Sequence, residues 1–334
     1  MQFAFHRREH PLLKTAARLG CLLLFLLAGC AHPAASLTIS PTSPTPSLTS
    51  NATPTASRVP ASLPAATQIE ASPVPSLTAT VLPPDFWQKL PVIPEQVSAR
   101  VREIYRQGIA KGENPRVFSR IGDCASAAPA FLVGFDRNYN LGEFTSLQPA
   151  IDYFKGSFER PSWAAKNGLN SAGLLSTLWT GEQCQKNESL LDCQYRLDHP
   201  SFAFIAIGTN EAYYVHENPG SFEKNMRLIL DDTIARGIVP ILGTKADDVE
   251  GDGSINATIA RLALEYELPL WNFWRAVQPL PNHGMVEPEH LSSVSYANFT
   301  DFTTPNSLQY GMQMRNLTAL QMLDFLRQQL AEEP

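Results

Sequence analysis

The chain has 334 residues, and its 26 Lys and Arg against 32 Asp and Glu give a net charge of −6 at pH 7. Residues 1–30 are basic, at net +3, whereas residues 85–334 are acidic, at net −9. This acidic balance argues against nucleic acid as a partner, because phosphate binding needs clustered Lys and Arg. The one long apolar run, Leu19 to Gly29, has 11 residues, whereas a spanning helix needs roughly 20. A polytopic membrane protein is therefore excluded.

The first thirty residues have the layout of an export signal, with a basic stretch followed by the apolar run and then Cys30. Residues 27–30, Leu-Ala-Gly-Cys, resemble a bacterial lipobox. This resemblance implies that residues 1–29 are a cleaved signal peptide and that Cys30 is diacylated, which holds a protein firmly on a bilayer. We therefore expect an exported protein, anchored by lipid at Cys30 to the outer face of the bacterial cell envelope. An ordinary signal peptide with a chance cysteine, or an uncleaved anchor, is the alternative.

Residues 30–84 have the composition of a disordered tether. Residues 31–84 hold 11 of the 27 prolines and 18 Ser or Thr, and only Arg58 and Glu70 are charged. Large apolar side chains are too sparse to offset the entropy of ordering this segment. The remaining residues, 85–334, are long enough for one α/β domain.

The domain is predicted to alternate strands with amphipathic helices. Apolar runs bounded by turn residues predict strands at residues 117–121, 162–166, 202–207, 238–242 and 269–274. Periodic stripes predict helices at residues 94–112, 219–236, 255–267 and 308–331, the second of them opened by Asn218 as N-cap and Pro219 in its first turn. Near-continuous apolar strands indicate a parallel sheet that is covered on both faces. Ligands of such sheets bind outside the carboxyl ends of the strands.

Three of the turns that follow strands, together with one motif near the end of the chain, resemble the SGNH/GDSL hydrolase family. The motifs are Gly122-Asp123-Cys124, the turn Asn167-Gly168-Leu169-Asn170-Ser171, Gly208-Thr209-Asn210-Glu211, and Glu287-Pro288-Glu289-His290. They occur in the family's order, with Cys in place of the family's nucleophilic Ser and Glu287 in place of its Asp. The resemblance implies a three-layer α/β/α sandwich with a mostly parallel, about five-stranded sheet of flavodoxin-like type.

The resemblance also implies roles for these residues. Cys124 is expected to be the nucleophile, His290 the base and Glu287 the group that orients His290. The amides of Cys124 and Gly168 and the side chain of Asn210 are expected to form the oxyanion hole. The implied reaction is hydrolysis of ester bonds in a small acyl ester or an O-acetylated glycan. It requires no cofactor, and no cluster of Cys and His suggests a metal.

Other interpretations of these residues remain open. Cys is among the most often buried residues, so Cys124 also fits a packing role, and Ser126 is then the fallback nucleophile. Asn210 also fits the N-cap of a following helix. Asp123 is expected to hold its turn by accepting backbone amides, and Glu289 to be solvated. The two departures from the family pattern favour an alternative function, a catalytically lapsed module that binds envelope glycans.

After removal of the signal and lipidation of Cys30, three cysteines remain, Cys124, Cys184 and Cys193. An odd number in an oxidising compartment leaves one thiol free. The short spacing between Cys184 and Cys193, in a polar stretch, predicts a local disulfide, which leaves Cys124 as the free thiol. Pairing of Cys124 with either of the others would exclude thiol catalysis. Nothing in the sequence sets the oligomeric state.

Overall fold

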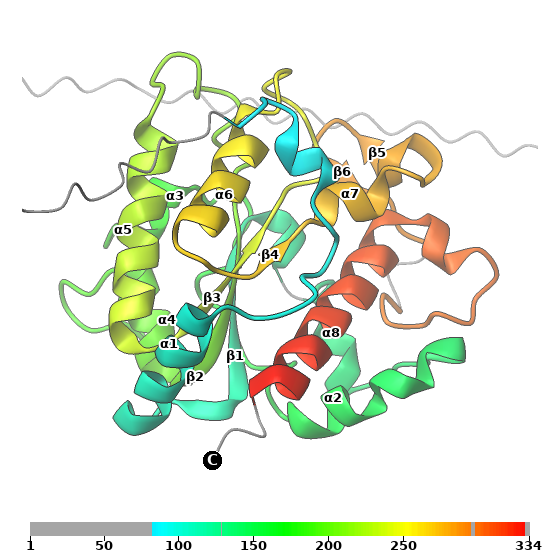
Figure 1. Cartoon of the computed structure of the whole chain (residues 1–334), viewed down its shortest axis with the longest axis horizontal. Coiled ribbons are helices and arrows are strands. Elements are labelled where there is room, and N and C mark those ends of the chain that lie inside the picture. Colours follow the sequence, from blue (N-terminus) through cyan, green and yellow to red (C-terminus); the bar gives the residue numbers. More distant parts are fainter. Residues whose placement is uncertain (1–81, 128, 295–297, 331–334) are drawn as a thin grey trace, which may run out of the picture. The chain divides into compact units, whose positions relative to one another are not determined.

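The computed structural model describes residues 82–127, 129–294 and 298–330 (Figure 1). The expected signal peptide, the lipidation site at Cys30 and nearly all of the expected tether lie outside these residues. None of the helices in the described part of the chain is long and apolar enough to cross a membrane.

A parallel sheet of four strands forms the centre of the domain (Figure 1). Its strands lie in chain order, β1 (Asn114–Gly122), β2 (Pro200–Ala206), β3 (Val239–Gly243) and β4 (Leu270–Trp271). Every residue of β2, β3 and β4 is buried, as expected for strands covered on both faces. The predicted parallel α/β architecture is thus confirmed, with four strands where about five were expected.

The missing strand is the one predicted at residues 162–166. This segment makes a single parallel bridge, between Ala165 and Gly122, on the edge of β1 away from β2. The amide of Gly122 donates to Ala164 O at 3.0 Å, and the amide of Lys166 donates to Gly122 O at 3.1 Å. In chain order the five segments therefore take the spatial order 2-1-3-4-5, and the chain reverses its direction of travel across the sheet at the carboxyl ends of β1 and β2.

Helices cover both faces of the sheet. On one side lie α1 (Ala99–Lys111), α5 (Ser221–Arg236) and α6 (Ser254–Glu265), and on the other α8 (Gly311–Leu330) packs against α2 (Gln148–Tyr153) and α7 (Phe273–Val277) (Figure 1). The remaining helices are α3 (Ser171–Leu174) and α4 (Leu190–Asp198). Short 3₁₀ segments span Phe86–Lys89, Cys124–Ser126, Val133–Asp136, Gly142–Leu147, Pro281–Gly284 and Ser307–Gln309. A separate hairpin joins β5 (Met285–Glu287) to β6 (His290–Leu291).

Several predicted boundaries are wrong, including the start of the first helix, which was expected at residue 94 and lies at Ala99. Two others have clear local reasons. The strand predicted at residues 269–274 ends after Trp271, because Asn272 caps α7 by accepting the amide of Arg275. Helix α5 begins at Ser221 with Gly220, in the left-handed region, as its N-cap, so Asn218 and Pro219 precede the helix. The periodic spacing of apolar residues predicts that a helix is present, but it does not define the residue at which the helix begins or ends.

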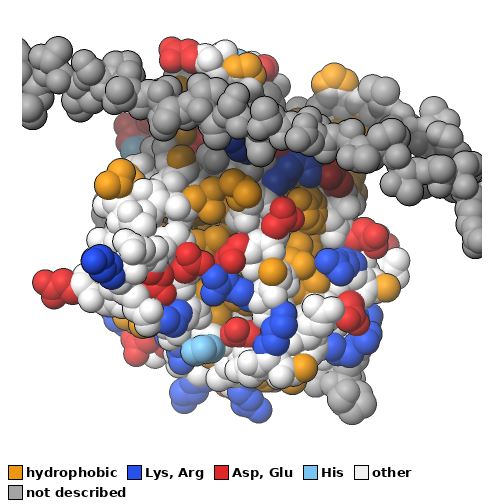
Figure 2. All heavy atoms as spheres, turned by 90° about the vertical axis from the view of Figure 1, so that its left-hand side faces the viewer, with side chains coloured by type: hydrophobic (Ala, Val, Ile, Leu, Met, Phe, Trp, Pro, Cys, Tyr) orange, Lys and Arg blue, Asp and Glu red, His pale blue; other side chains and the backbone are white. Residues whose placement is uncertain are grey.

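The face of the molecule over α5 carries acidic and basic side chains next to one another (Figure 2). Arg227 of α5 contacts Glu223 at 2.9 Å and Glu265 of α6 at 2.6 Å. Arg261 of α6 contacts Glu223 at 2.6 Å. These ion pairs join the two helices across the surface and leave charges of both signs intermixed there.

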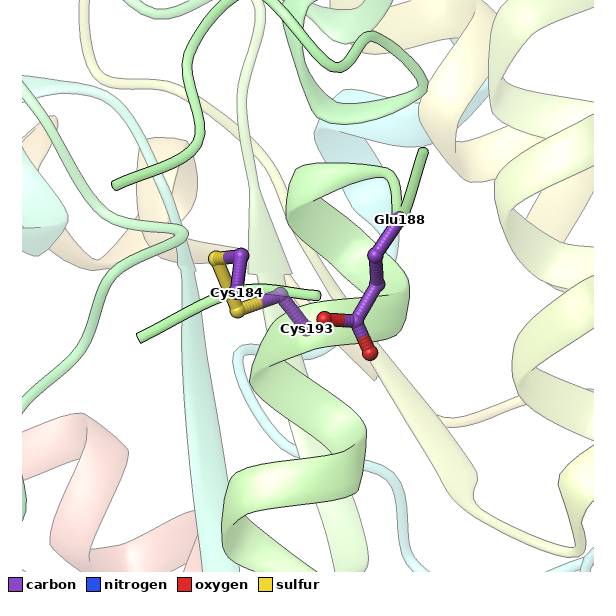
Figure 3. A group of neighbouring side chains, drawn as sticks. All are labelled: Cys184, Glu188 and Cys193. Carbon is purple, nitrogen blue, oxygen red and sulfur yellow. A yellow bond between two sulfur atoms is a disulfide. The ribbon is translucent and has the colours of Figure 1, made fainter. Parts of the chain in front are cut away.

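The predicted disulfide between Cys184 and Cys193 is confirmed, and Cys124 is the free cysteine of the described residues. The side chain of Glu188 lies close to both sulfur atoms, so these three form the one described group of His, Cys, Asp or Glu that could surround an ion (Figure 3). However, the two sulfurs are bonded to each other, and the Glu188 carboxylate accepts from Arg196 at 2.7 and 2.9 Å. A cysteine binds a metal ion as a free thiolate, so this disulfide-bonded pair is a structural crosslink.

We expect the variant Cys184→Ala/Cys193→Ala to have a free energy of unfolding about 2–3 kcal/mol below that of the wild type, because the disulfide closes a short loop in the unfolded chain. Urea denaturation with and without dithiothreitol measures this difference. The reductant should destabilise the wild type and leave the variant unchanged. A variant as stable as the oxidised wild type would contradict the prediction.

Candidate active site

The loops that follow β1 and β2 lie side by side at the carboxyl edge of the sheet. Gly122, the last residue of β1, pairs with Ala206 of β2. A Cβ atom on Gly122 would lie 2.1 Å from Ala206 O and 2.5 Å from Ser126 Oγ, so only glycine fits there. This explains the glycine of the Gly-Asp-Cys turn: it allows the chain to bend directly over the neighbouring strand and places Cys124 at the edge.

Cys124 begins a short 3₁₀ segment, Cys124–Ser126, for which Asp123 is the N-cap. The carboxylate of Asp123 accepts the amide of Ala125 at 3.2 Å and also accepts from the amide of Thr209 in the next loop. The expectation that Asp123 holds the turn through backbone amides is therefore confirmed. Ser126, the fallback nucleophile, is buried, and its Oγ donates to Ala206 O and accepts from Arg315, so it faces away from the surface.

Partial burial, and secondarily the negative charge of Asp123, raise the pKa of the Cys124 thiol to about 11. At neutral pH the side chain is thus a protonated thiol. A thiol in this state needs a base to remove its proton during attack, since the thiolate is the nucleophile.

His290 and Glu287 face each other across the β5–β6 hairpin. The Nδ1 atom of His290 lies 2.8 Å from Glu287 Oε1, which leaves Nε2 for another partner. The side chain of His290 is 53% exposed and that of Glu287 is 59% exposed. Glu287 can thus orient the imidazole, and the pair is open to substrate and solvent.

Glu289 was expected to be solvated, but it has a hydrogen-bond partner in the protein. Its carboxylate accepts a hydrogen bond from the hydroxyl of Tyr213, in the loop after β2. The hairpin is also attached to the first turn of α8, where the amide of Met312 donates to Ser292 O at 2.9 Å. Gly284 and Gly311 touch there, since a Cβ on Gly311 would lie 2.1 Å from Gly284 O. The hairpin is therefore held from two sides.

Cys124, Glu287 and His290 line one cavity of about 370 Å³. Other lining residues are Ala125, Pro129, Ala130, Val286, Glu289, Leu291, Ser293, Phe299 and Met312. The structure thus brings together the three residues expected to be nucleophile, base and orienting acid, although 166 positions separate Cys124 from His290 in the chain.

Gly168 and Asn210, the other expected oxyanion donors, are not among the residues that line this cavity. The side-chain Nδ2 of Asn210 donates to Leu169 O at 2.8 Å, and an amide group has a second N–H beyond that one. Asn210 therefore ties the loop after β2 to the turn that contains Gly168. It caps no helix in the described structure, since its partner is a carbonyl on another loop.

A buried arginine that the sequence motifs did not indicate lies directly beneath the Cys124 turn. Arg315 of α8 donates from Nε to Ala125 O at 3.0 Å and from Nη2 to Ser126 Oγ at 2.9 Å. Its guanidinium lies 4.7–5.0 Å from the ring centres of Phe131, Trp271 and Phe273. Burial lowers the pKa of Arg315 to about 10, so it remains a cation at neutral pH and faces the buried carboxyl of Asp123.

A second buried charge cluster supports the loop after β3. Lys245 Nζ donates to Asp247 Oδ1 at 2.7 Å and to Glu250 Oε2 at 2.5 Å. Asp247 Oδ2 accepts from the Thr209 hydroxyl at 2.7 Å, next to Asn210. Lys245 and Asp247 follow a predicted strand, so the sequence indicates that they lie at the edge of the sheet. The sequence does not indicate that they pair with each other.

The raised pKa of the Cys124 thiol predicts how the rate of its alkylation depends on pH. The rate of Cys124 alkylation by iodoacetamide should still increase about tenfold per pH unit between pH 9 and 10, because only about half of the thiol is ionised even at pH 11. Mass spectrometry of the peptide that contains Cys124 measures this rate, with N-acetylcysteine as the reference thiol. A plateau near pH 9 would contradict the proposed burial of the sulfur.

No protein-family model matches the chain, and no curated protein matches it at a significant level. The fold and the site together define an α/β protein with a free thiol, a His–Glu pair and an open cavity at the carboxyl edge of its parallel sheet.

Proposed function

We propose that residues 85–334 form an SGNH-like hydrolase that cleaves ester bonds through a covalent acyl-enzyme on Cys124. The observation that carries the proposal is the cavity of about 370 Å³ lined by Cys124 together with the His290–Glu287 pair. The spatial order 2-1-3-4-5 of the five sheet segments supports it, because this flavodoxin-like order places the binding site between the first strand and its later neighbour, where Cys124 lies.

In the proposed reaction, His290 Nε2 removes the proton of the Cys124 thiol as the sulfur attacks the ester carbonyl. The amide of Cys124 is the proposed first donor to the oxyanion. The amide of Gly168 and the second N–H of Asn210 are proposed as further donors, which requires the substrate to extend beyond the residues that line the cavity. When the carbon–oxygen bond breaks, protonated His290 gives its proton to the departing alcohol. Water, deprotonated by His290, then cleaves the thioester, releasing the carboxylic acid and restoring the thiol. The protein's own residues suffice for these steps, and we propose no cofactor.

The proposed setting is the outer face of a bacterial cell envelope, with the protein anchored to the membrane by lipid at Cys30. The alternative is a catalytically lapsed module that binds envelope glycans in the same cavity. The thiol pKa of about 11 and the hydrogen bond from Asn210 to Leu169 O favour this alternative, since both work against catalysis.

Hydrolysis of p-nitrophenyl acetate by the wild type, Cys124→Ala and Cys124→Ser variants separates the two functions. The hydrolase proposal requires turnover by the wild type that Cys124→Ala lacks, and an acetyl adduct on the peptide containing Cys124 after rapid acid quenching. Cys124→Ser keeps a nucleophile at the same position, smaller and on a shorter bond to Cβ, and should retain measurable turnover. Equal background rates in all three proteins, without an adduct, would instead support the binding module.

A further inference from the structure

The cavity beside Cys124 is larger and more apolar than an acetyl group requires. Hydrophobic lining side chains include Ala125, Pro129, Ala130, Leu291, Phe299 and Met312. An acetyl group has three non-hydrogen atoms, each about as large as the ~30 Å³ share of one water molecule in liquid. It would therefore fill only about a quarter of the 370 Å³, and part of the remainder is available to the alcohol at the rim.

The inner wall of this cavity is fixed by hydrogen bonds to α8. Asn316 Nδ2 donates to Ala130 O at 2.9 Å, and Asn316 Oδ1 accepts the amide of Leu132. Met312, which is 9% exposed, stands one helical turn before Asn316 and is joined through its amide to Ser292 O. The apolar wall is therefore built before a substrate enters, and little ordering is needed on binding.

The two ends of the cavity differ in exposure. Val286, Glu287 and His290 form its outer rim, and their exposed fractions are 66%, 59% and 53%. The departing alcohol must leave beside His290, which protonates it, so the alcohol belongs at this open rim. The acyl carbon is bonded to the Cys124 sulfur, and the groups attached to it can extend along the apolar wall towards Met312.

We propose that the acyl group of the substrate is an alkyl chain of medium length, held against Ala130 and Met312, rather than acetyl. This inference rests on the proposed hydrolase function and specifies its substrate class. Each methylene buried in the cavity contributes about 0.8 kcal/mol, which corresponds to about a fourfold increase in kcat/KM.

The first test is a series of p-nitrophenyl esters from acetate to octanoate, hydrolysed by the full chain. We expect kcat/KM to increase up to about fourfold per methylene until the cavity is full. Ala130→Leu should lower the octanoate-to-acetate ratio by at least about tenfold, because its added carbons occupy the place of substrate methylenes. Met312→Ala, which enlarges the cavity, should move the optimum to a longer chain. The matched control Ala110→Leu, on the exposed face of α1, should leave the ratio unchanged.

A second test does not need hydrolysis. Alkyl methanethiosulfonates transfer their alkylthio group to the Cys124 thiolate, forming a mixed disulfide and releasing methanesulfinate. With rates normalised to N-acetylcysteine and located by peptide mass spectrometry, modification of Cys124 should accelerate from the methyl to the hexyl reagent, by up to about fourfold per methylene.

The two tests separate the inference from the function on which it rests. Ester turnover that favours acetate, with modification rates independent of chain length, overturns the alkyl cavity and leaves the hydrolase proposal standing. Absence of turnover, with modification that accelerates with chain length, overturns the hydrolase and supports the alkyl site. No turnover and no dependence on chain length would overturn both.

Discussion

Replacement of His290 by alanine is expected to lower kcat/KM for a p-nitrophenyl ester at pH 7 by about 10²–10⁴-fold. The cause lies in the thiol: with a pKa of about 11, Cys124 is almost entirely protonated at this pH and requires a base at the moment of attack. His290 lines the same cavity as the sulfur and has Nε2 unused by Glu287.

The loss should shrink as the pH rises. Above about pH 10 a growing fraction of Cys124 ionises without help, so the rates of His290→Ala and wild type should approach each other. His283→Ala is the matched control, since His283 belongs to the turn before the same hairpin and its Nδ1 contacts Gln278 O at 3.0 Å. Wild-type rates in His290→Ala at pH 7 would show that another group is the base.

Replacement of Glu287, the proposed orienting acid, should lower kcat/KM less than replacement of His290, the proposed base. Glu287 is 59% exposed, and its contact with the imidazolium that forms during attack contributes at most about 1 kcal/mol. Glu287→Gln should therefore lower kcat/KM by about fivefold or less. A loss as large as that of His290→Ala would mean that substrate binding buries the pair.

The largest effect on stability is expected from Arg315→Met. This change removes the positive charge whose coulombic attraction offsets the burial of the Asp123 carboxyl. Breaking a contacting buried pair costs about 3–5 kcal/mol, which is the upper limit for these two separated groups. The change also removes the hydrogen bonds to Ala125 O and Ser126 Oγ that hold the Cys124 turn. Urea unfolding at pH 7 measures the loss, and Arg137→Met, at an exposed ion pair with Glu159, should change stability by less than about 1 kcal/mol.

A double-mutant cycle identifies the cause of that loss. If the unpaired carboxylate is responsible, Asp123→Asn/Arg315→Met should be less destabilised than the sum of its single variants.

The stability difference between Arg315→Met and the wild type should also depend on pH, with a defined sign. Burial raises the pKa of Asp123, so the folded state retains its proton to higher pH than the unfolded state, and removal of Arg315 strengthens this effect. The Arg315→Met variant should therefore regain stability, relative to wild type, as pH falls from 7 towards 4. Additive single effects and a pH-independent difference would assign the loss to packing against Phe131 and Trp271 instead.

The strands were predictable where the local pattern is strong. The run at residues 202–207 is apolar throughout, and the observed β2 is buried along its whole length. The segment at 162–166, Ser-Trp-Ala-Ala-Lys, is apolar only at its three middle residues, and only Ala165 bridges to β1. The pattern at 269–274 could not reveal that Asn272 would bond to Trp87 O and Leu90 O and end the strand.

Some residues of the candidate site could likewise be predicted from the sequence, and others could not. Gly122, Cys124 and Asn210 follow strands, so their places at the carboxyl edge could be expected from the sequence. Arg315 could not be found from its helical periodicity, because its burial depends on three aromatic rings from distant parts of the chain. The Tyr213–Glu289 contact likewise joins residues with no shared motif, and the order of motifs gave no reason to expect it.

The N-terminal half of α8 is a common support for both halves of the proposed catalytic pair. Its first turn holds the His290 hairpin through Gly311 and Met312, and Arg315, one turn on, holds the backbone of the Cys124 turn from below. Any shift of this helix along its axis would carry base and nucleophile in the same direction. A substitution that repositions this half of α8 should therefore affect the base and the nucleophile together.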